Sequence, residues 1–357
     1  MADFHELTVQ EVYKETKDCV AVTFAVPDNL KDTFSYKQGQ YLTLKKVIGG
    51  EDVRRSYSLC SSPLENKWQV GIKKVPGGKF STYANEVLTV GDTIEVMAPN
   101  GNFYVEVNEE AEKQYVFFAA GSGITPILSI IKTHLAKEPN SKFKLFYLNK
   151  TAKSIIFKEE IEGLKNRYLG RFEIYYFLTK ENRGLPLLYG RFNEEKIQEI
   201  TSKIVAAKSI DECFICGPEQ MIFLIKDELE KAGLEKEKIH FELFNTGNSE
   251  ENKKQIAEAL EKQADSTEIT IIDADKEFHF QMDAAYDNIL DAALANDADL
   301  PFACKGGVCC TCKAKVIEGA VEMKLNYGLE PYEVAQGYVL TCQAVPTTEK
   351  VVVDFDA

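Results

Sequence analysis

The sequence predicts a multidomain chain of α/β and β structure, with an antiparallel β-barrel, a parallel α/β domain and a small C-terminal domain built around cysteines. Three observations lead to this prediction. The first hundred residues are short β-branched and aromatic runs between turn residues. Strands then alternate with helices, which is typical of a parallel sheet covered on both faces. Five of the nine cysteines lie in the last 54 residues, a density typical of a metal site.

Length and composition limit the class of protein. A chain of 357 residues, 45% of them hydrophobic, is long enough for two or three globular domains. The formal net charge of −14 argues against nucleic acid as the main partner. No apolar run reaches the ~18 residues of a membrane span, and the polar N-terminus does not resemble a secretory signal. We therefore expect a cytoplasmic protein without disulfides and with no nucleic acid or membrane partner.

The negative charge is concentrated near the C-terminus. Residues 265–357 contain 17 acidic and 6 basic side chains, a net charge of −11, whereas the first 264 residues carry a net charge of −3. Such a block can be a solvated face or a surface that guides the docking of a protein partner. Both interpretations stay open until a partner is suggested.

Six strands are predicted in the first domain, which we place at residues 1–110. The runs are rich in Val, Ile, Thr, Tyr and Phe, and Gly, Pro, Asn and Asp separate them. Short strands at this spacing favour an antiparallel barrel. The six runs are residues 7–13, 19–26, 41–46, 56–60, 68–73 and 93–98.

The second domain, at residues 111–244, alternates strands with helices. Its first strand is a continuous apolar run, as in a strand buried on both faces, and a glycine turn and an apolar helix follow it. The predicted strands are residues 115–119, 143–148, 172–178, 213–216 and 239–244, and the predicted helices are residues 127–135, 154–167, 193–206 and 219–231.

A polar, turn-rich stretch follows, and we place a linker at residues 245–265. Residues 256–264 can form one or two helical turns but offer little core, so a partly helical tether is expected. The last domain, at residues 266–357, begins with two runs that can pair as strands. Its predicted strands are residues 269–273, 278–282, 314–317 and 351–355, and its predicted helix is residues 288–295.

The cysteine loop carries the most specific spacing in the chain. Cys304, Cys309 and Cys312 form a C-x4-C-x2-C pattern, and Cys342 follows after 29 further residues. This is the spacing of a plant-type [2Fe–2S] cluster, which four thiolates hold. A zinc site is the alternative, but zinc ribbons prefer two C-x2-4-C knuckles, which the lone Cys342 fits poorly. Cys310 breaks the pattern, so we expect it to be a spare buried thiol.

The chemistry of such a cluster points to a flavin in the same chain. A nicotinamide delivers two electrons together as hydride, whereas the cluster accepts one, and a flavin can divide the pair. Residues 55–58 read Arg-Ser-Tyr-Ser, and residues 77–81 read Gly-Gly-Lys-Phe-Ser before a predicted helix. Bare amides and a hydroxyl at a helix start suit a pyrophosphate, although a plain hairpin turn is the alternative for the two glycines.

Motifs of the second domain suit a nicotinamide nucleotide. Residues 121–126 read Gly-Ser-Gly-Ile-Thr-Pro between a strand and a helix, where glycines let a pyrophosphate approach the backbone. An ordinary strand–helix turn is the alternative. Residues 216–218 read Cys-Gly-Pro at a strand end, and residues 241–244 read Phe-Glu-Leu-Phe. A small buried cysteine and a terminal core strand are the alternatives for these two motifs.

In this order, the motifs resemble the ferredoxin–NADP reductase superfamily, in the arrangement of flavin domain, nucleotide domain and plant-type ferredoxin. The resemblance covers nearly the full chain and implies a β-grasp fold for the ferredoxin domain. It implies that Arg55 contacts the flavin phosphates, that Tyr57 packs near the isoalloxazine and that Ser58 lies by its N5. The glycine motif is similar to the FAD form, so FAD is expected in preference to FMN.

The resemblance also implies that Cys216 sits by the nicotinamide, so Ser58 and Cys216 are the expected catalytic residues. Related reductases commonly show Asn-Arg where this chain has Asn149 and Lys150. Lys150 keeps the positive charge but lacks the guanidinium group with which arginine binds a 2′-phosphate through two hydrogen bonds. No acidic residue stands there for the NADH ribose, so NADPH is favoured and NADH is the alternative. The expected cofactor-binding residues are Arg55, Tyr57, Ser58, Gly77, Gly78, Ser81, Gly121, Gly123, Thr125, Pro126, Asn149, Lys150, Cys216, Gly217, Glu242 and Phe244, and the expected cluster ligands are Cys304, Cys309, Cys312 and Cys342.

The predicted function is therefore that of an NAD(P)H-dependent oxidoreductase that passes electrons through FAD and a [2Fe–2S] cluster to an oxygenase. Residues 326–330 and 337–344 are similar to reductases that serve the epoxidation of phenylacetyl-CoA, which implies a multi-subunit di-iron epoxidase as the acceptor. A reductase of another mono- or dioxygenase is an alternative that shares every cofactor motif. A redox-sensing protein that holds the cofactors without steady turnover is the other alternative.

Overall fold

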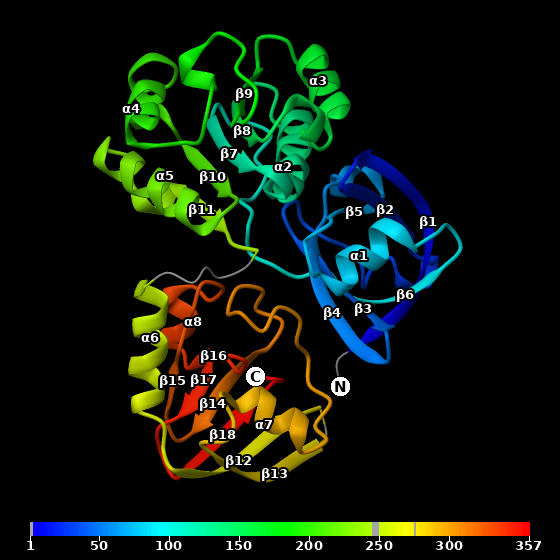
Figure 1. The fold of residues 1–357 in the computed structure, drawn as a ribbon, viewed down its shortest axis with the longest axis vertical. Coiled ribbons are helices and arrows are strands. Elements are labelled where there is room, and N and C mark those ends of the chain that lie inside the picture. Colours follow the sequence, from blue (N-terminus) through cyan, green and yellow to red (C-terminus); the bar gives the residue numbers. More distant parts are fainter. Residues whose placement is uncertain (1–2, 245–249, 275) are drawn as a thin grey trace. The chain divides into compact units, whose positions relative to one another are not determined.

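Six antiparallel strands form an N-terminal barrel in the computed structural model, which describes residues 3–244, 250–274 and 276–357 (Figure 1). The strands follow the order β4-β3-β6-β1-β2-β5. Leu59, directly after β4, bridges Val70 of β5, so the two edge strands meet and the sheet closes. The predicted antiparallel barrel is confirmed. Its elements are β1 (Phe4–Thr16), β2 (Cys19–Ala25), β3 (Tyr41–Ile48), β4 (Glu51–Ser58), β5 (Trp68–Lys73), α1 (Lys79–Glu86) and β6 (Thr93–Met97), with short 3-10 turns at Asp28–Leu30 and Pro63–Glu65, the second labelled η2.

Strand β4 differs from the prediction. The sequence suggested residues 56–60, but the strand runs from Glu51 to Ser58 and pairs with β3 across a two-glycine turn. Its first half carries Glu51, Asp52 and Arg55 on exposed positions, and only Val53 and Arg54 are buried there. Because this part of the strand is mostly charged, a search for β-branched and aromatic runs does not detect it.

Five parallel strands in the order β11-β10-β7-β8-β9 form the second sheet, as predicted. Helices α2 and α3 lie on one face and α4 and α5 on the other (Figure 1). The middle strand β7 contributes a run of fully buried residues because both of its faces are covered. The elements are β7 (Gln114–Ala120), α2 (Ile124–Lys137), β8 (Lys142–Asn149), α3 (Lys158–Arg167), β9 (Phe172–Leu178), α4 (Glu194–Lys203), β10 (Glu212–Cys216), α5 (Glu219–Lys231) and β11 (Ile239–Glu242), with a 3-10 turn η3 at Gly121–Gly123 before α2.

The barrel and the parallel sheet share one apolar core. Cys19, Ala21 and Cys60 of the barrel belong to the same buried cluster as the residues under α2 and β7. Phe103, which follows β6, meets Phe214 of β10 edge to face with 5.4 Å between ring centroids. Residues 5–243 accordingly form one compact unit.

Residues 244–357 belong to a second compact unit. Its main sheet has the order β13-β12-β18-β14-β16, with β12 and β18 parallel and the other pairs antiparallel. This arrangement, with α7 packed against strands, agrees with the predicted β-grasp domain. The elements are α6 (Glu250–Glu261), β12 (Ser266–Asp273), β13 (Lys276–Asp283), α7 (Ile289–Ala295), β14 (Lys313–Glu318), β15 (Val321–Met323), α8 (Pro331–Ala335), β16 (Tyr338–Leu340), β17 (Ala344–Pro346) and β18 (Lys350–Asp354).

Helix α6 occupies most of the expected linker. Its Asn252 is buried, and Oδ1 of that side chain accepts a hydrogen bond of 2.7 Å from the Tyr327 hydroxyl. The helix therefore packs within the C-terminal unit. Residues 245–249 of the expected linker lie outside the described residues, and the domain boundaries at 110 and 265 stay predictions.

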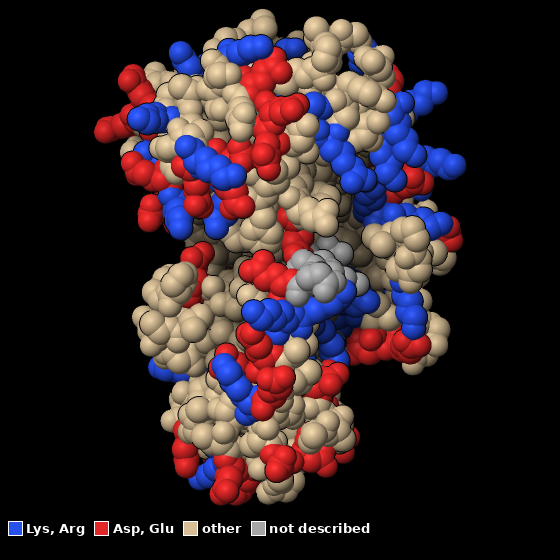
Figure 2. Space-filling view, turned by 60° about the vertical axis from the view of Figure 1, so that its left-hand side comes forward, with Lys and Arg blue, Asp and Glu red and all other residues tan. Residues whose placement is uncertain are grey.

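The C-terminal unit carries an excess of acidic side chains. At least five of its lysines pair with carboxylates of the same unit, among them Lys305 with Asp291 at 2.7 Å, Lys313 with Glu333 at 3.1 Å and Lys350 with Glu318 at 3.0 Å. Figure 2 shows both signs of charge interspersed on the face in view. The acidic side chains still outnumber the basic ones by 11 in residues 265–357. Among the described residues, no helix has the length and apolarity needed to cross a membrane.

Candidate functional site

Ser58 and Glu242 connect the barrel with the parallel sheet. Ser58 ends β4, and its buried hydroxyl donates a hydrogen bond of 3.1 Å to Oε2 of Glu242 at the end of β11. Burial raises the pKa of the half-buried Glu242 carboxyl to about 8, although the hydrogen bond from Ser58 acts in the opposite direction. At neutral pH, this carboxyl therefore holds a proton next to Ser58.

Cys216 lies at the same edge of the sheet. It ends β10 and is paired with Glu242 on one side and Ala119 on the other. Its thiol is fully buried, and burial raises its pKa, so the thiol is protonated. A Cβ on Gly123 would lie 2.2 Å from the Cys216 carbonyl oxygen, so only glycine permits this approach of the two loops. Gly217 is less constrained, because the atom that its Cβ would meet at 2.6 Å is the flexible end of the Met221 side chain.

The predicted nucleotide loop sits between β7 and α2. Its first turn is η3, and α2 begins at Ile124 directly after it. The Tyr147 hydroxyl fixes the loop by donating a 2.9 Å hydrogen bond to the Gly121 carbonyl. The Thr125 hydroxyl donates to the Ser122 carbonyl over 3.0 Å, so this side chain shapes the loop, and Pro126 stands in the first turn of α2. The amides at the start of a helix without intrahelical partners suit an anionic group.

Lys73 is a candidate phosphate-binding residue that no sequence motif singles out. It ends β5 of the barrel, yet its Nζ lies 3.0 Å from the place that a Cβ of Gly121 would occupy. Burial lowers the pKa of Lys73, and the nearby charge of Lys150 also lowers it. Two cations therefore stand near the nucleotide loop, one from each domain. Only the fold could reveal this, because Lys73 precedes the loop by almost fifty residues.

Asn149 and Lys150 follow the second parallel strand, as expected. Asn149 ends β8 and is buried, whereas Lys150 is exposed. An exposed cation at the carboxyl end of a parallel strand can reach a bound nucleotide. Phe244 is 40% exposed and lies in the C-terminal unit, so its expected place near the flavin stays a prediction.

The two expected flavin motifs come together on the barrel. The Tyr57 ring of β4 lies 5.6 Å from that of Phe80 in the first turn of α1, and Lys79 pairs with Glu51. Arg55 is exposed on the same strand, where it can reach phosphate groups. Gly77 and Gly78 precede α1 in the predicted turn.

Ser81 has a different local role from the one suggested by its place near a helix start. Its hydroxyl accepts a 3.1 Å hydrogen bond from the Val75 amide and donates a 3.3 Å bond to the Gly78 carbonyl. The side chain is buried. The hydroxyl therefore holds the shape of the glycine turn, and its contact with a flavin phosphate stays a prediction.

Backbone and side-chain amides donate hydrogen bonds to the cysteine sulfurs. The Gly306 amide donates to Sγ of Cys304 over 3.3 Å, and Gln343 Nε2 donates to Sγ of Cys342 over 3.8 Å. The hydrogen bond from the Cys309 thiol lowers the pKa of Cys304, and backbone amides lower it further, although burial acts in the opposite direction. Gly307 has φ of +74°, which lets the loop turn sharply. Such donors stabilise thiolates, which are the form that binds iron.

The four expected ligands form two pairs. Cys304 is hydrogen-bonded to Cys309, and Cys312 is hydrogen-bonded to Cys342. Across the described ranges, no three His, Cys, Asp or Glu side chains gather closely enough to hold one metal ion. Two pairs suit two irons with two thiolates each, whereas a zinc site needs four ligands around one ion. The donor set therefore fits a [2Fe–2S] cluster better than zinc. Cys310 lies outside both pairs, with its thiol part-buried.

Three domain families match the chain in the predicted order. The oxidoreductase FAD-binding domain matches residues 6–104, the oxidoreductase NAD-binding domain matches residues 117–227, and the 2Fe-2S iron-sulfur cluster binding domain matches residues 271–347. The chain therefore has binding domains for FAD, a nicotinamide nucleotide and a [2Fe–2S] cluster, and the predicted cofactors are confirmed.

Two relatives are similar over nearly the full length. One subunit of the 1,2-phenylacetyl-CoA epoxidase of Escherichia coli (strain K12) is 43% identical, over 100% of this chain and 99% of that protein. The ferredoxin reductase component of the 3-ketosteroid-9-alpha-monooxygenase of Rhodococcus rhodochrous is 33% identical, over 98% of this chain and 96% of that protein. Among solved structures, phthalate dioxygenase reductase has the same fold, with a TM-score of 0.60 and 20% identity over 99% of this chain and 98% of that one.

Proposed function

Because this chain belongs to the ferredoxin–NADP reductase superfamily, among the members with a C-terminal plant-type [2Fe–2S] domain, we propose that it passes electrons from NADPH through FAD and the cluster to an oxygenase. We propose a phenylacetyl-CoA epoxidase, a multi-subunit di-iron enzyme, as that acceptor, in the cytoplasm. The 43% identity to one subunit of such an epoxidase supports this choice over other oxygenases.

The observation that carries the proposal is the 3.1 Å contact between Ser58 and Glu242. It brings the strand of the Arg-Ser-Tyr-Ser motif to the edge of the parallel sheet where Cys216 ends β10. A flavin bound at this barrel strand and a nicotinamide bound at the Cys216 end of β10 would then lie close together. When bound, FAD accepts a hydride from NADPH and releases the electrons singly to the cluster.

Residues of this chain supply the surroundings for that chemistry. Ser58 donates its one hydroxyl proton to Glu242 and could donate it at the flavin edge only by turning away from that carboxyl, while Glu242 holds a proton beside it at neutral pH. Cys216 is buried and uncharged, so it can pack against the nicotinamide ring without an electrostatic cost.

The nucleotide loop and two lysines can bind the phosphate groups of the nucleotide. The amides at the start of α2 can bind the pyrophosphate of the nucleotide, and Lys73 stands beside Gly121. Lys150 is exposed at the end of the neighbouring strand and can attract the 2′-phosphate that NADPH has and NADH lacks. This supports NADPH as the preferred donor.

The C-terminal unit would carry the electrons outward. Cys304, Cys309, Cys312 and Cys342 would hold the cluster, and the amides around them would stabilise its negative charge. The acidic excess of this unit suits docking to a basic surface of the oxygenase.

Reconstitution with purified oxygenases tests the acceptor. The FAD- and cluster-loaded chain is mixed with NADPH, phenylacetyl-CoA and the epoxidase oxygenase, and epoxide formation is measured against NADPH consumption. The matched control replaces the oxygenase with that of a 3-ketosteroid monooxygenase and its own substrate. Tight coupling in the first mixture alone is the expected result.

Two other results would assign a different function. Rapid cytochrome c reduction with no epoxide formed would indicate a reductase of another oxygenase. Failure of NADPH to drive steady cytochrome c reduction would favour a redox-sensing protein.

A further inference from the structure

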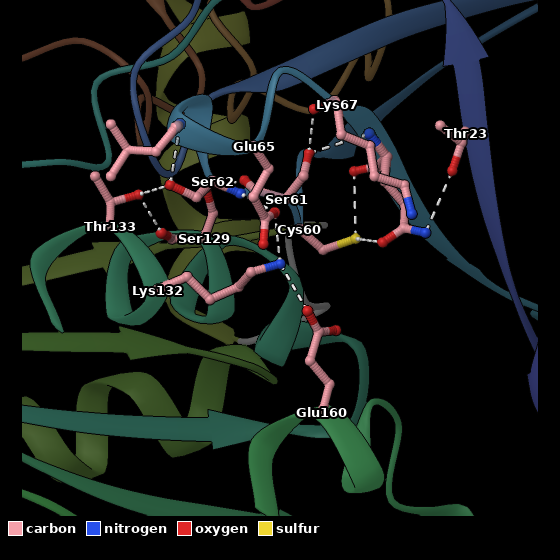
Figure 3. A network of polar contacts seen from close by, with 12 residues as sticks. Thr23, Cys60, Ser61, Ser62, Glu65, Lys67, Ser129, Lys132, Thr133 and Glu160 are labelled. Atoms are coloured by element: carbon pink, nitrogen blue, oxygen red, sulfur yellow. Dashed lines mark hydrogen bonds and ion pairs between the residues drawn. The ribbon is translucent and has the colours of Figure 1, made fainter. Parts of the chain in front are cut away.

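One face of helix α2 is bound to the barrel by hydroxyl groups. Thr125, Ser129 and Thr133 recur at every fourth position, so they lie on the same side of the helix. Ser129 Oγ donates a 2.6 Å hydrogen bond to the Ser61 carbonyl, and the hydroxyls of Thr133 and Ser62 are 2.8 Å apart. Figure 3 shows Ser129 and Thr133 of α2 next to Ser61 and Ser62 of the barrel. Ser129 and Thr133 therefore make polar contacts with the barrel, whereas the Thr125 hydroxyl bonds to the Ser122 carbonyl within its own loop.

Thr133 and its neighbours leave no free hydroxyl at this contact. Thr133 Oγ1 donates to the Ser129 carbonyl within α2 over 2.7 Å, so the shared bond to Ser62 has the Ser62 hydroxyl as its donor. Ser62 Oγ in turn accepts a bond from the Leu64 amide over 3.2 Å. A fully paired buried polar contact fixes one geometry, because any shift leaves a group unsatisfied.

Lys132 lies in the same network and is nearly buried, with 8% of its surface exposed. Its ammonium is 2.7 Å from Oε2 of Glu65 in η2 of the barrel and 2.6 Å from Oε1 of Glu160 in α3 (Figure 3). Burial alone would lower the pKa of Lys132, but the two carboxylates raise it above the ordinary value. The side chain is thus a cation that binds one partner in each domain.

Glu65 is itself held in place. Its Oε2 accepts a 2.8 Å hydrogen bond from the Ser62 amide, which completes a capping box at the start of η2. The Lys132 ammonium therefore binds a carboxylate with a defined position, instead of a mobile surface group. Removal of the ammonium would leave the two carboxylates, whose side chains are 38% and 36% exposed, without the cation that they share.

The helix connects this anchor to the reacting groups. Lys132 is eight residues after Ile124, the first residue of α2, which corresponds to ~12 Å along a helix at ~1.5 Å per residue. The nucleotide loop directly precedes that first residue. Because a three- to four-turn helix is stiff, its position against the barrel determines where the loop lies relative to the flavin side.

We propose that Lys132 is a positioning residue for hydride transfer, holding α2 so that the nucleotide loop is correctly placed against the flavin-binding barrel. The inference rests on the proposed function. The reaction that it positions moves two electrons and one proton together from NADPH to FAD, which leaves NADP⁺ and reduced flavin. Such transfers require reacting atoms ~3–3.5 Å apart, and a misplacement of ~1 Å can lower the rate ~100-fold.

Anaerobic stopped-flow reduction of the FAD- and cluster-loaded chain tests the inference. Lys132→Met keeps the length and apolar stem of the side chain but removes the ammonium. At saturating NADPH, we expect its flavin reduction to be about 10- to 100-fold slower than in the wild type. The isotope effect with NADPH deuterated at the transferred position should increase, while the Kd for NADPH and the FAD content should change less than about threefold.

Lys137→Met is the matched control on the same helix. Lys137 is 42% exposed and pairs only at the surface with Glu109, at 2.9 Å. We expect this variant to reduce its flavin at the wild-type rate with the wild-type isotope effect.

Two milder variants keep the test decisive if Lys132→Met does not fold. Glu65→Gln weakens the bond to the barrel, whereas Glu160→Gln weakens only the bond within the nucleotide domain. Slower hydride transfer with a larger isotope effect is expected for Glu65→Gln and not for Glu160→Gln. Equal behaviour of the two variants, or wild-type rates and isotope effects in Lys132→Met, would overturn the inference. A wild-type chain that NADPH cannot reduce would instead contradict the proposed function.

Discussion

Glu242→Gln should make the folded chain less sensitive to alkaline pH. Burial raises the pKa of Glu242 from 4.5 to about 8 in the folded state. A carboxyl with a raised folded pKa stabilises the fold fully at low pH, and this contribution is lost as pH rises from 4.5 to about 8. Glutamine has nearly the same shape and no charge to bury. The variant should therefore lose this source of pH dependence while keeping a partner for Ser58.

The size of the effect on the free energy of unfolding follows from the shift in the pKa of Glu242. Each pKa unit corresponds to ~1.4 kcal/mol, so a rise from 4.5 to about 8 gives an upper limit of about 5 kcal/mol. A comparison that starts at pH 5.5 covers about 2.5 of these units, or about 3.4 kcal/mol. Because Glu242 is only half-buried, solvent screening reduces this to about 2 kcal/mol between pH 5.5 and pH 9. For a unit of this size, ~2–4 °C per kcal/mol converts that value to a difference of about 4–8 °C in melting temperature.

Thermal unfolding at pH 5.5 and pH 9 measures this difference. The melting temperature of Glu242→Gln minus that of the wild type should rise by several degrees between the two pH values. Glu237→Gln, an exposed position shortly before β11, serves as the control and should show little change. A difference for Glu242→Gln that is equal at both pH values would mean that the carboxyl is not buried as described, and the reasoning about its proton would fail.

Three further predictions concern the cofactors. Cys309→Ser should abolish the visible absorption of the cluster, whereas Cys310→Ser should keep it, since Cys310 lies outside the two cysteine pairs; loss in both variants would refute the ligand assignment. Lys150→Glu should raise the KM for NADPH much more than that for NADH, as measured by steady-state kinetics with each donor. Lys73→Met should raise both KM values several-fold, because Lys73 stands beside the nucleotide loop. Equal effects of Lys150→Glu on both KM values would refute the proposed contact of Lys150 with the 2′-phosphate. A fragment ending at Leu243 should still reduce ferricyanide with NADPH but should reduce cytochrome c far more slowly than the whole chain; equal cytochrome c rates would remove the need for the cluster.

The sequence predicted those parts of the fold whose signal is local. The five parallel strands appear as apolar runs because both faces of that sheet are covered, and their predicted bounds differ from the observed ones by a few residues at most. The cysteine spacing likewise indicated the cluster type, since the spacing itself reflects how a loop wraps two irons. Strand β4 was placed too late because its exposed half consists of charged residues.

Contacts between distant parts of the chain could not be predicted in the same way. Lys73 ends a barrel strand and looks like any surface lysine until the fold places it beside Gly121. Ser129 and Lys132 lie in an apolar helix, where periodicity shows a buried face but not which domain covers it. By its sequence, helix α6 has little apolar surface to bury. Its buried Asn252 is hydrogen-bonded by the hydroxyl of Tyr327, more than seventy residues later, which local patterns do not reveal.

The apolar cluster that the barrel shares with the parallel sheet restricts how this chain can be recombined with its relatives. A chimaera joined near residue 110 would combine Cys19, Cys60 and Phe103 of one parent with the surface under α2 and β10 of another. Those surfaces would have to match in shape, as two halves of one core do. Every member of this cluster precedes residue 244, where one compact unit ends and the other begins. Functional hybrids should therefore keep the flavin and nucleotide domains of one parent together.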